Sequence, residues 1–186
     1  NIIQLKPRYR MNKINYLTFT GILMALAGVA MLASENIGVS TAKIAVPAFF
    51  LLGGIFAYLF SAANKQHKIA RQYHLLQGLG MMTFAIIIAI IPQSLDEFLK
   101  YITYFMLLFG LLEILFGFLA LNTGNKLNMN ILISRFVAGF VNIIGAVLIL
   151  ATAVTDEISG LMIAGVLILL GGLAFVMFSF RIRKMA

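Results

Sequence analysis

The stretch Leu51-Leu52-Gly53-Gly54 returns twice in similar form in this chain, as Leu107-Leu108-Phe109-Gly110 and as Leu169-Leu170-Gly171-Gly172. Another glycine-bearing stretch precedes each copy, in Thr20-Gly21-Ile22-Leu23, Gln77-Gly78-Leu79-Gly80 and Ala138-Gly139-Phe140-Val141. The copies follow one another at about 60-residue intervals, and self-similarity at a regular period is the signature of a repeated supersecondary unit. The order of the stretches predicts one helical hairpin used three times.

The composition indicates that the chain is surrounded by lipid and not by water. It has 186 residues, of which 62% are hydrophobic and 11% are charged, whereas soluble domains are about 45–50% apolar and about 25% charged. A chain of this length cannot bury so much apolar surface, so we expect lipid to be its solvent. The absence of cysteine excludes disulfides, thiol catalysis and thiolate metal sites.

Six apolar segments divide the chain, at about residues 15–33, 44–63, 73–92, 99–121, 131–154 and 158–180. Each approaches or exceeds the ~20 residues that cross a hydrocarbon core of ~30 Å. Strands are not expected, because the segments lack alternating polarity and are twice as long as a ~10-residue barrel strand. The sequence therefore predicts an all-α membrane protein with six transmembrane helices, with Pro47 in the first turn of the second and Pro92 ending the third.

The charged residues predict the orientation in the membrane. All Lys and Arg residues except Lys43 and Lys100 lie before the first segment, after the sixth, or in the second-to-third and fourth-to-fifth connections, with Arg135 at the start of the fifth segment counted in the last of these. The positive-inside rule places these parts, and with them both termini, on the cytoplasmic side of the membrane. The net charge of +8 then predicts contact with anionic lipids. Nucleic-acid binding is not expected, because the sequence has no basic surface interleaved with aromatic residues.

The predicted organisation is a basic cytoplasmic tail at 1–14, one transmembrane domain at 15–181 and a basic tail at 182–186. Its hairpins span about 15–64, 73–121 and 131–181, and all three start from the cytoplasm. Such parallel repeats are related by an axis along the membrane normal, which predicts a pseudo-threefold bundle. Ala30-Met31-Leu32-Ala33 resembles a signal-peptide cleavage site, but cleavage there would leave half a hairpin, so we expect a retained first helix.

Small residues are expected to pack the helices, because close backbone approach supplies the association energy in lipid. The glycines concerned are Gly21, Gly54, Gly78, Gly110, Gly139 and Gly172. A hinge role for the paired glycines of the second and sixth helices is the alternative. Small-residue faces also leave room for a homo-oligomer or a membrane-protein partner. Tyr16, Tyr73, Tyr101 and Tyr104 are expected to anchor the helices at the membrane interfaces.

Glu113 is the one acidic residue inside an apolar segment. It lies about 12 Å from the cytoplasmic end of its helix at a rise of ~1.5 Å per residue. A carboxylate at this depth costs a few kcal/mol, so it should face protein or water, or be protonated. Its repeat equivalents, Ala57 and Phe175, are apolar. Two interpretations stay open: a proton or cation site, and a neutral acid donating one interhelical hydrogen bond.

Asn142 is the expected partner of Glu113. It lies about 16 Å into the fifth helix, and its repeat equivalents are Met24 and Met81. An amide in lipid usually bonds across helices, so we predict that Asn142 contacts Glu113.

His67 and His74 lie in the second connection together with Lys65, Lys68 and Arg71. Histidine titrates near neutral pH, so a cytoplasmic pH sensor is one interpretation and a solvated loop is the other. The cations around them disfavour a metal site. No nucleophile–base pair, phosphate-binding loop or catalytic carboxylate pair is recognisable, so we expect neither an enzyme nor a cofactor.

The run from Leu107 to Ile114 is a hydrophobic stretch followed by Gly, a polar residue and Ile. It resembles the second-helix pattern of the HdeD-like family of small bacterial inner-membrane proteins, as does the layout of three short-looped hairpins over residues 15–181. The resemblance implies a non-enzymatic integral membrane protein with a part in acid or envelope stress. The alternative expectation is a small proton, ion or solute transporter or channel that uses Glu113.

Overall fold

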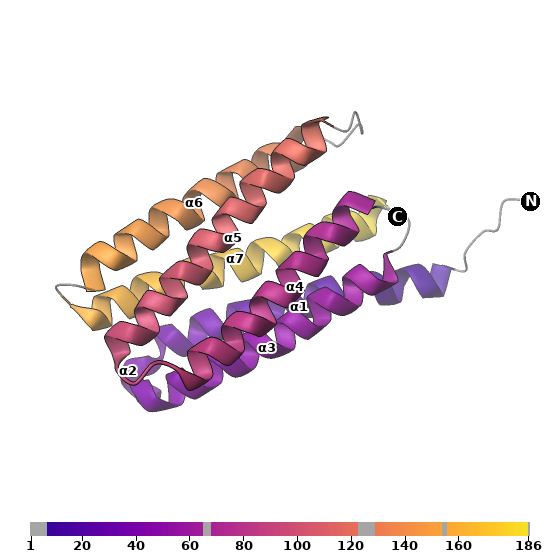
Figure 1. Ribbon diagram of the computed structural model, residues 1–186. Helices are drawn as coiled ribbons and strands as arrows, with labels where there is room; N and C mark the ends of the chain where they lie inside the picture. Colours follow the sequence, from indigo (N-terminus) through magenta and orange to yellow (C-terminus); the bar gives the residue numbers. More distant parts are fainter. Residues whose placement is uncertain (1–6, 65–67, 123–128, 154–155, 186) are drawn as a thin grey trace, which may run out of the picture.

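The computed structural model describes residues 7–64, 68–122, 129–153 and 156–185, and all regular secondary structure in these ranges is helical (Figure 1). In chain order the helices are α1 (Pro7–Leu32), α2 (Ser34–Ile37), α3 (Val39–Ala63), α4 (Lys68–Ile90), α5 (Leu95–Asn122), α6 (Met129–Ala153) and α7 (Glu157–Met185). The all-α prediction is confirmed.

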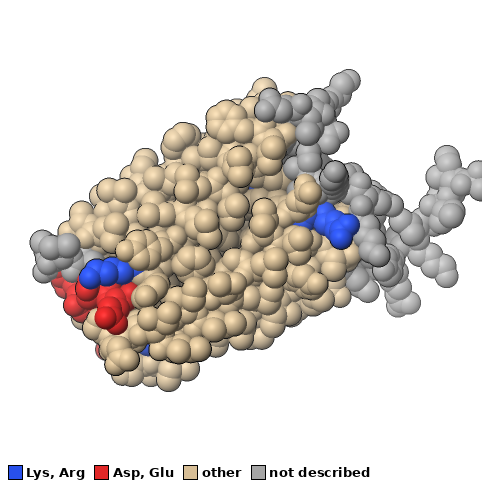
Figure 2. Space-filling model, in the orientation of Figure 1, with Lys and Arg blue, Asp and Glu red and all other residues tan. Residues whose placement is uncertain are grey.

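Six of these helices are long and apolar enough to cross a membrane: the spans are Ile14–Leu32, Val39–Ala63, Arg71–Ile90, Leu95–Leu119, Arg135–Thr152 and Glu157–Phe180. They coincide with the six predicted segments and indicate a multi-pass membrane protein. Acidic side chains gather at one end of the molecule, and the visible surface between the two ends carries no charged side chain (Figure 2). That uncharged band is the surface expected to face hydrocarbon.

Helix ends differ from the predicted segment ends because hydropathy marks the hydrocarbon core and not the helix. α1 begins at Pro7, so residues 7–14 of the predicted tail are helical. Proline suits a first helical position, where its fixed φ is an advantage and its missing N–H costs little. At the other end, α7 continues to Met185 through most of the predicted tail at 182–186.

The predicted place of Pro47 in a first helical turn is wrong. α3 starts at Val39, after Gly38 with φ +87°, so Pro47 lies inside the helix. The polar residues Ser40, Thr41 and Lys43 hid the first turns of α3 from a hydropathy reading. Pro92, in contrast, lies just beyond the end of α4, as predicted. The helix ends at Ile90, and the N–H of Ile91 still donates to the carbonyl oxygen of Ile87.

The six spanning helices close into a ring in chain order. Each packs on the next, from α1 on α3 through to α6 on α7, and α7 then packs on α1. The most extensive contacts are α1 with α7, α3 with α4, and α5 with α6. Each of these pairs joins two of the hairpins that the sequence predicts, so the tightest interfaces lie between hairpins.

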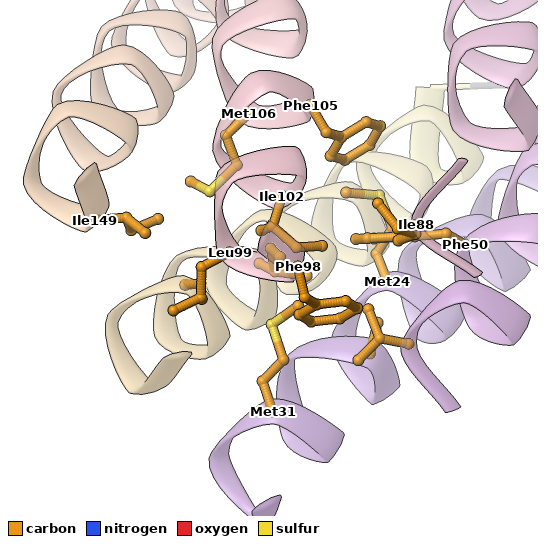
Figure 3. Close-up of a cluster of buried hydrophobic side chains, with 14 of the residues drawn as sticks. Met24, Met31, Phe50, Ile88, Phe98, Leu99, Ile102, Phe105, Met106 and Ile149 are labelled. Carbon is orange, nitrogen blue, oxygen red and sulfur yellow. The ribbon is translucent and has the colours of Figure 1, made fainter. Parts of the chain in front are cut away.

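The ring is filled by apolar side chains in the half that contains the α4–α5 connection. Phe98, Ile102, Phe50 and Met31 are fully buried there (Figure 3). Phe98 belongs to the first turns of α5 and Met31 to the last turn of α1, which places this cluster near the end that carries the acidic connections. Most of the buried polar side chains among the described residues lie instead in the other half: Thr20, Ser61, His74, Gln77, Glu113 and Ser179.

Candidate functional site

Glycine pairs bring the backbones of the three tightest helix pairs together. A methyl group added to Gly172 would lie 2.7 Å from the carbonyl oxygen of Gly21, and one on Gly21 would lie 2.8 Å from that of Gly172. The same reciprocal relation joins Gly54 to Gly78 at 2.9 and 2.8 Å, and Gly110 to Gly139 at 2.7 and 2.8 Å. Any side chain at these positions would push two backbones apart. All six predicted packing glycines therefore lie at helix crossings.

The crossing of α5 and α6 brings two opposite charges together. Glu113 follows Gly110 by three residues and Arg135 precedes Gly139 by four. Because the two helices are antiparallel, both side chains lie about one turn from the crossing in the same direction. The Arg135 Nη1 donates to Glu113 Oε2 at 2.9 Å, and the two side chains are 11% and 6% exposed.

Tyr73 completes the set of partners of Glu113. Its hydroxyl donates to Glu113 Oε1 from α4, and Tyr73 itself is 4% exposed. The predicted role of Tyr73 as an interface anchor is therefore wrong, since its ring and its hydroxyl are both inside the bundle. Tyr104, by contrast, is half exposed, as an interface anchor should be.

Three aromatic rings surround the Arg135 guanidinium. Its central carbon lies 4.4 Å from the ring centroid of Tyr73, 4.6 Å from that of Phe116 and 5.4 Å from that of Phe178. The rings belong to α4, α5 and α7, and the guanidinium to α6. A cation within about 6 Å of a ring face is attracted by the ring quadrupole. We call Tyr73, Glu113, Phe116, Arg135 and Phe178 the cation cage.

The structure does not pair Glu113 with Asn142 as predicted. Glu113 lies one turn from the glycine crossing in one direction, and Asn142, three residues after Gly139, lies one turn in the other. At ~1.5 Å per residue the two positions are separated by about 9 Å along the helix axes. Among the described residues, the hydrogen bonds of Glu113 go to Tyr73 and Arg135.

His74 is not in a solvated loop but inside α4. It is 2% exposed, its Nδ1 lies 2.8 Å from Gln77 Oε1, and Phe60 meets its ring edge-on at 4.7 Å between centroids. Gln77 is fully buried and its Nε2 has no hydrogen-bond partner in the described part of the chain. A buried imidazole cannot report cytoplasmic pH directly, which argues against the sensor role. His67 lies outside the described residues.

The crossing of α1 and α7 uses the same positions with different side chains. Leu17 and Phe175 stand where Arg135 and Glu113 stand at the other crossing. The polar contact here is neutral, between the hydroxyls of Thr18 and Ser179 at 2.8 Å. No buried charge is thus needed for a glycine crossing to form.

Sequence reasoning missed Arg135, Phe116 and Phe178 as site residues. Arg135 was assigned to a cytoplasmic connection, although it is the first residue of a membrane span. A signal for the rings was present, because Phe60, Phe116 and Phe178 each follow the crossing glycine of their own helix by six residues. Phe60 packs on His74 as Phe116 packs on Arg135, and both of these partners lie four residues before a crossing glycine.

The Glu113 carboxylate and the three aromatic faces of the cage can bind a cation, and in this structure the Arg135 guanidinium is that cation. The described residues contain no group of three or more His, Cys, Asp or Glu side chains able to hold a metal ion. No family model, curated protein or solved structure matches the chain. Fold and site together define a multi-pass helical membrane protein with an ion pair buried between its helices.

Proposed function

We propose that this chain is a non-enzymatic protein of the bacterial inner membrane, of the HdeD-like kind, that acts in acid or envelope stress. The observation that carries the proposal is that the described interior holds packed apolar side chains and a neutralised charge. The centre of the ring holds Phe98, Ile102 and Phe50 in one half, and Glu113 in the other half is neutralised by Arg135. A bundle with a filled axis and paired charges is suited to stable packing in the membrane and to contacts with partners or lipids.

The orientation belongs to the same proposal. Both termini lie in the cytoplasm, where Arg71 and the other basic residues near that end contact anionic lipid head groups. The acidic turns, with Asp96, Glu97 and Asp156, face the outside. An accessible-cysteine scan would check this, since the chain has no native cysteine: a cysteine at exposed Asp156 should react with an impermeant reagent added outside, and one at exposed Arg71 should not.

We include the repeat in the proposal: three hairpins descend from one unit and surround a pseudo-threefold axis. The equivalent glycine pairs at the three crossings support it, as does the recurrence of phenylalanine six residues further along. The third pairing, of α7 with α1, closes the ring, as three hairpins around a common axis would require.

Deletion of the gene tests the function. We expect reduced survival after an acid or envelope challenge, restored by the wild-type gene and by Gly171→Leu but not by Gly172→Leu. The two variants form a matched pair, because a Cβ atom at position 171 meets no atom within 4 Å while one at position 172 meets the backbone of α1. Survival equal to wild type in every challenge would remove the proposal.

A second candidate is a small proton, ion or solute transporter, and the buried Glu113 favours it because ionisable residues inside a membrane often mark transport paths. The purified protein in liposomes should then carry protons or a solute under a pH or voltage gradient. Glu113→Gln should change that rate, whereas a substitution of exposed Leu111 on the same helix should not. Flux equal to that of empty liposomes would exclude this function.

A further inference from the structure

The cation cage has the chemistry of a ligand site. A carboxylate supplies the counter-charge at 2.9 Å from the guanidinium, and three rings supply polarisable walls at 4.4, 4.6 and 5.4 Å. Carboxylate and aromatic faces together favour weakly hydrated cations such as guanidinium and quaternary ammonium. A strongly hydrated metal ion would need several more oxygen ligands than Glu113 provides.

Arg135, which now occupies the cage, belongs to the helix from which its side chain can most readily reach the membrane interface. Arg135 is the first residue of its membrane span, and α6 has the least buried of the six spans. Its side chain keeps 11% of its surface exposed. Arginine near the end of a membrane span readily extends its charged head to the interface, so Arg135 has a route from the cage towards the interface.

The walls and the counter-charge are held more firmly than the occupant. Glu113 and Tyr73 are both 4% exposed and joined by a hydrogen bond. The Tyr73 and Phe116 rings pack on one another at 4.5 Å between centroids. When Arg135 leaves, an empty aromatic cage with an uncompensated carboxylate remains, and another cation that enters the cage restores its charge balance.

We propose that the cage is a binding site for small organic cations of the guanidinium or quaternary ammonium class, and that Arg135 is an internal occupant which such a cation displaces. The exchange conserves the net charge of the site. It goes beyond the proposed function, since binding requires neither transport nor a stress response.

Tryptophan fluorescence offers a direct assay, because the chain contains no Trp. Phe178→Trp places one fluorophore in the cage wall and keeps an aromatic face. Three purified proteins are titrated with ethylguanidinium: Phe178→Trp, Phe178→Trp with Arg135→Ala, and Phe178→Trp with both Arg135→Ala and Glu113→Gln. N-ethylurea, a neutral molecule of similar shape, is the control ligand, and tetramethylammonium is a second cation.

We expect the Arg135→Ala protein to bind ethylguanidinium at least about tenfold more tightly than Phe178→Trp alone, since the internal competitor is gone. Adding Glu113→Gln should abolish this gain, and N-ethylurea should give no saturable change. Arg71→Ala in the Phe178→Trp background is the matched control, because it removes an exposed arginine from the same end of the bundle and should leave the affinity unchanged.

Equal responses to ethylguanidinium and N-ethylurea in a folded Arg135→Ala protein would overturn the proposal, and so would binding that survives Glu113→Gln. Should Arg135→Ala fail to fold, rescue of its folding by millimolar ethylguanidinium but not N-ethylurea supports the site, and failure of both counts against it. The fluorescence titration measures neither flux nor survival, so the binding site can be tested even if the proposed function proves wrong.

Discussion

The crossings α5·α6 and α1·α7 are built alike and filled differently. Both bring two glycines together so closely that a methyl group on either would meet the opposite carbonyl oxygen within 2.8 Å. One turn away, α5·α6 buries the ion pair of Glu113 and Arg135, whereas α1·α7 has Leu17 and Phe175 at the equivalent positions. Glycines therefore determine how close the helices come, and the neighbouring turn determines the chemistry.

This difference separates stability from function at the two crossings. Buried charge is not required for packing, because the apolar crossing forms the more extensive contact of the two. An apolar replacement of a buried ion pair is often neutral or stabilising by about 1–4 kcal/mol. The ion pair at α5·α6 is thus better explained by a role of its own than by a need for stability.

The largest effect is expected from breaking the ion pair on one side. Arg135→Ala leaves Glu113 buried without its cation and should destabilise the protein by about 3–5 kcal/mol, measured by reversible unfolding in detergent. Removing all three polar groups together, with Tyr73→Phe, Glu113→Leu and Arg135→Met, makes this crossing resemble α1·α7. That variant should unfold near the wild-type midpoint, and equal damage from both variants would contradict the comparison.

Glycine substitution should affect α1·α7 by an intermediate amount. Gly172→Ala places a methyl group 2.7 Å from Gly21 O and should cost about 1–3 kcal/mol of unfolding free energy, the usual cost of overpacking. Gly171→Ala is its neighbour and control, because nothing lies within 4 Å of that position, and it should be neutral or stabilising by up to about 1 kcal/mol. Similar losses for both would mean that the helices are not in close contact there.

The sequence predicted those features of the two crossings that do not depend on which residues become neighbours in the fold. The six spans and crossing glycines are local in origin: apolar length and small residues reveal them without knowledge of partners. Which residue contacts Glu113 depends on the register of α5 against α6. Depth alone suggested Asn142, but the antiparallel crossing at Gly110 and Gly139 places Arg135 on the same side as Glu113 and Asn142 on the other.

Arg135 and Pro47 were misplaced for one shared reason. Hydropathy follows the membrane boundary, and polar residues near that boundary can still be helical and buried. Arg135 begins a span, and Pro47 lies inside α3 because Ser40 and Thr41 belong to the helix too. The glycine-based register would have corrected the first of these, since Arg135 holds the same place relative to Gly139 as Leu17, inside the first predicted segment, does to Gly21.

A smaller effect is expected from the neutral polar contact of α1·α7. Thr18→Val removes the hydroxyl that meets Ser179 and should lower the unfolding free energy by about 0.6 kcal/mol, the average for such bonds in membranes. Thr83→Val, on an exposed face of α4, is the control and should be silent. A loss as large as that of Arg135→Ala would mean that the two crossings rely on polar contacts equally.

The smallest effect concerns the turn that joins the two crossings, where Asp156 precedes α7. The backbone N–H of Ile158 donates to Asp156 Oδ1 at 3.1 Å, and the Ser159 hydroxyl donates to Oδ2. These bonds, with that of Ser159 first, lower the pKa of the Asp156 carboxyl below its ordinary value of 3.8.

A carboxyl whose folded pKa is lowered stabilises the fold above its unfolded pKa, and that contribution is lost as pH falls through the folded value. Wild-type protein should therefore lose slightly more stability than Asp156→Asn on acidification below about pH 4. Unfolding midpoints of both proteins, measured across that range in one detergent, check this. Because Asp156 is fully exposed, the difference should be the smallest of the four. A large acid effect that persists in Asp156→Asn would mean that a group other than Asp156 makes the fold acid-sensitive.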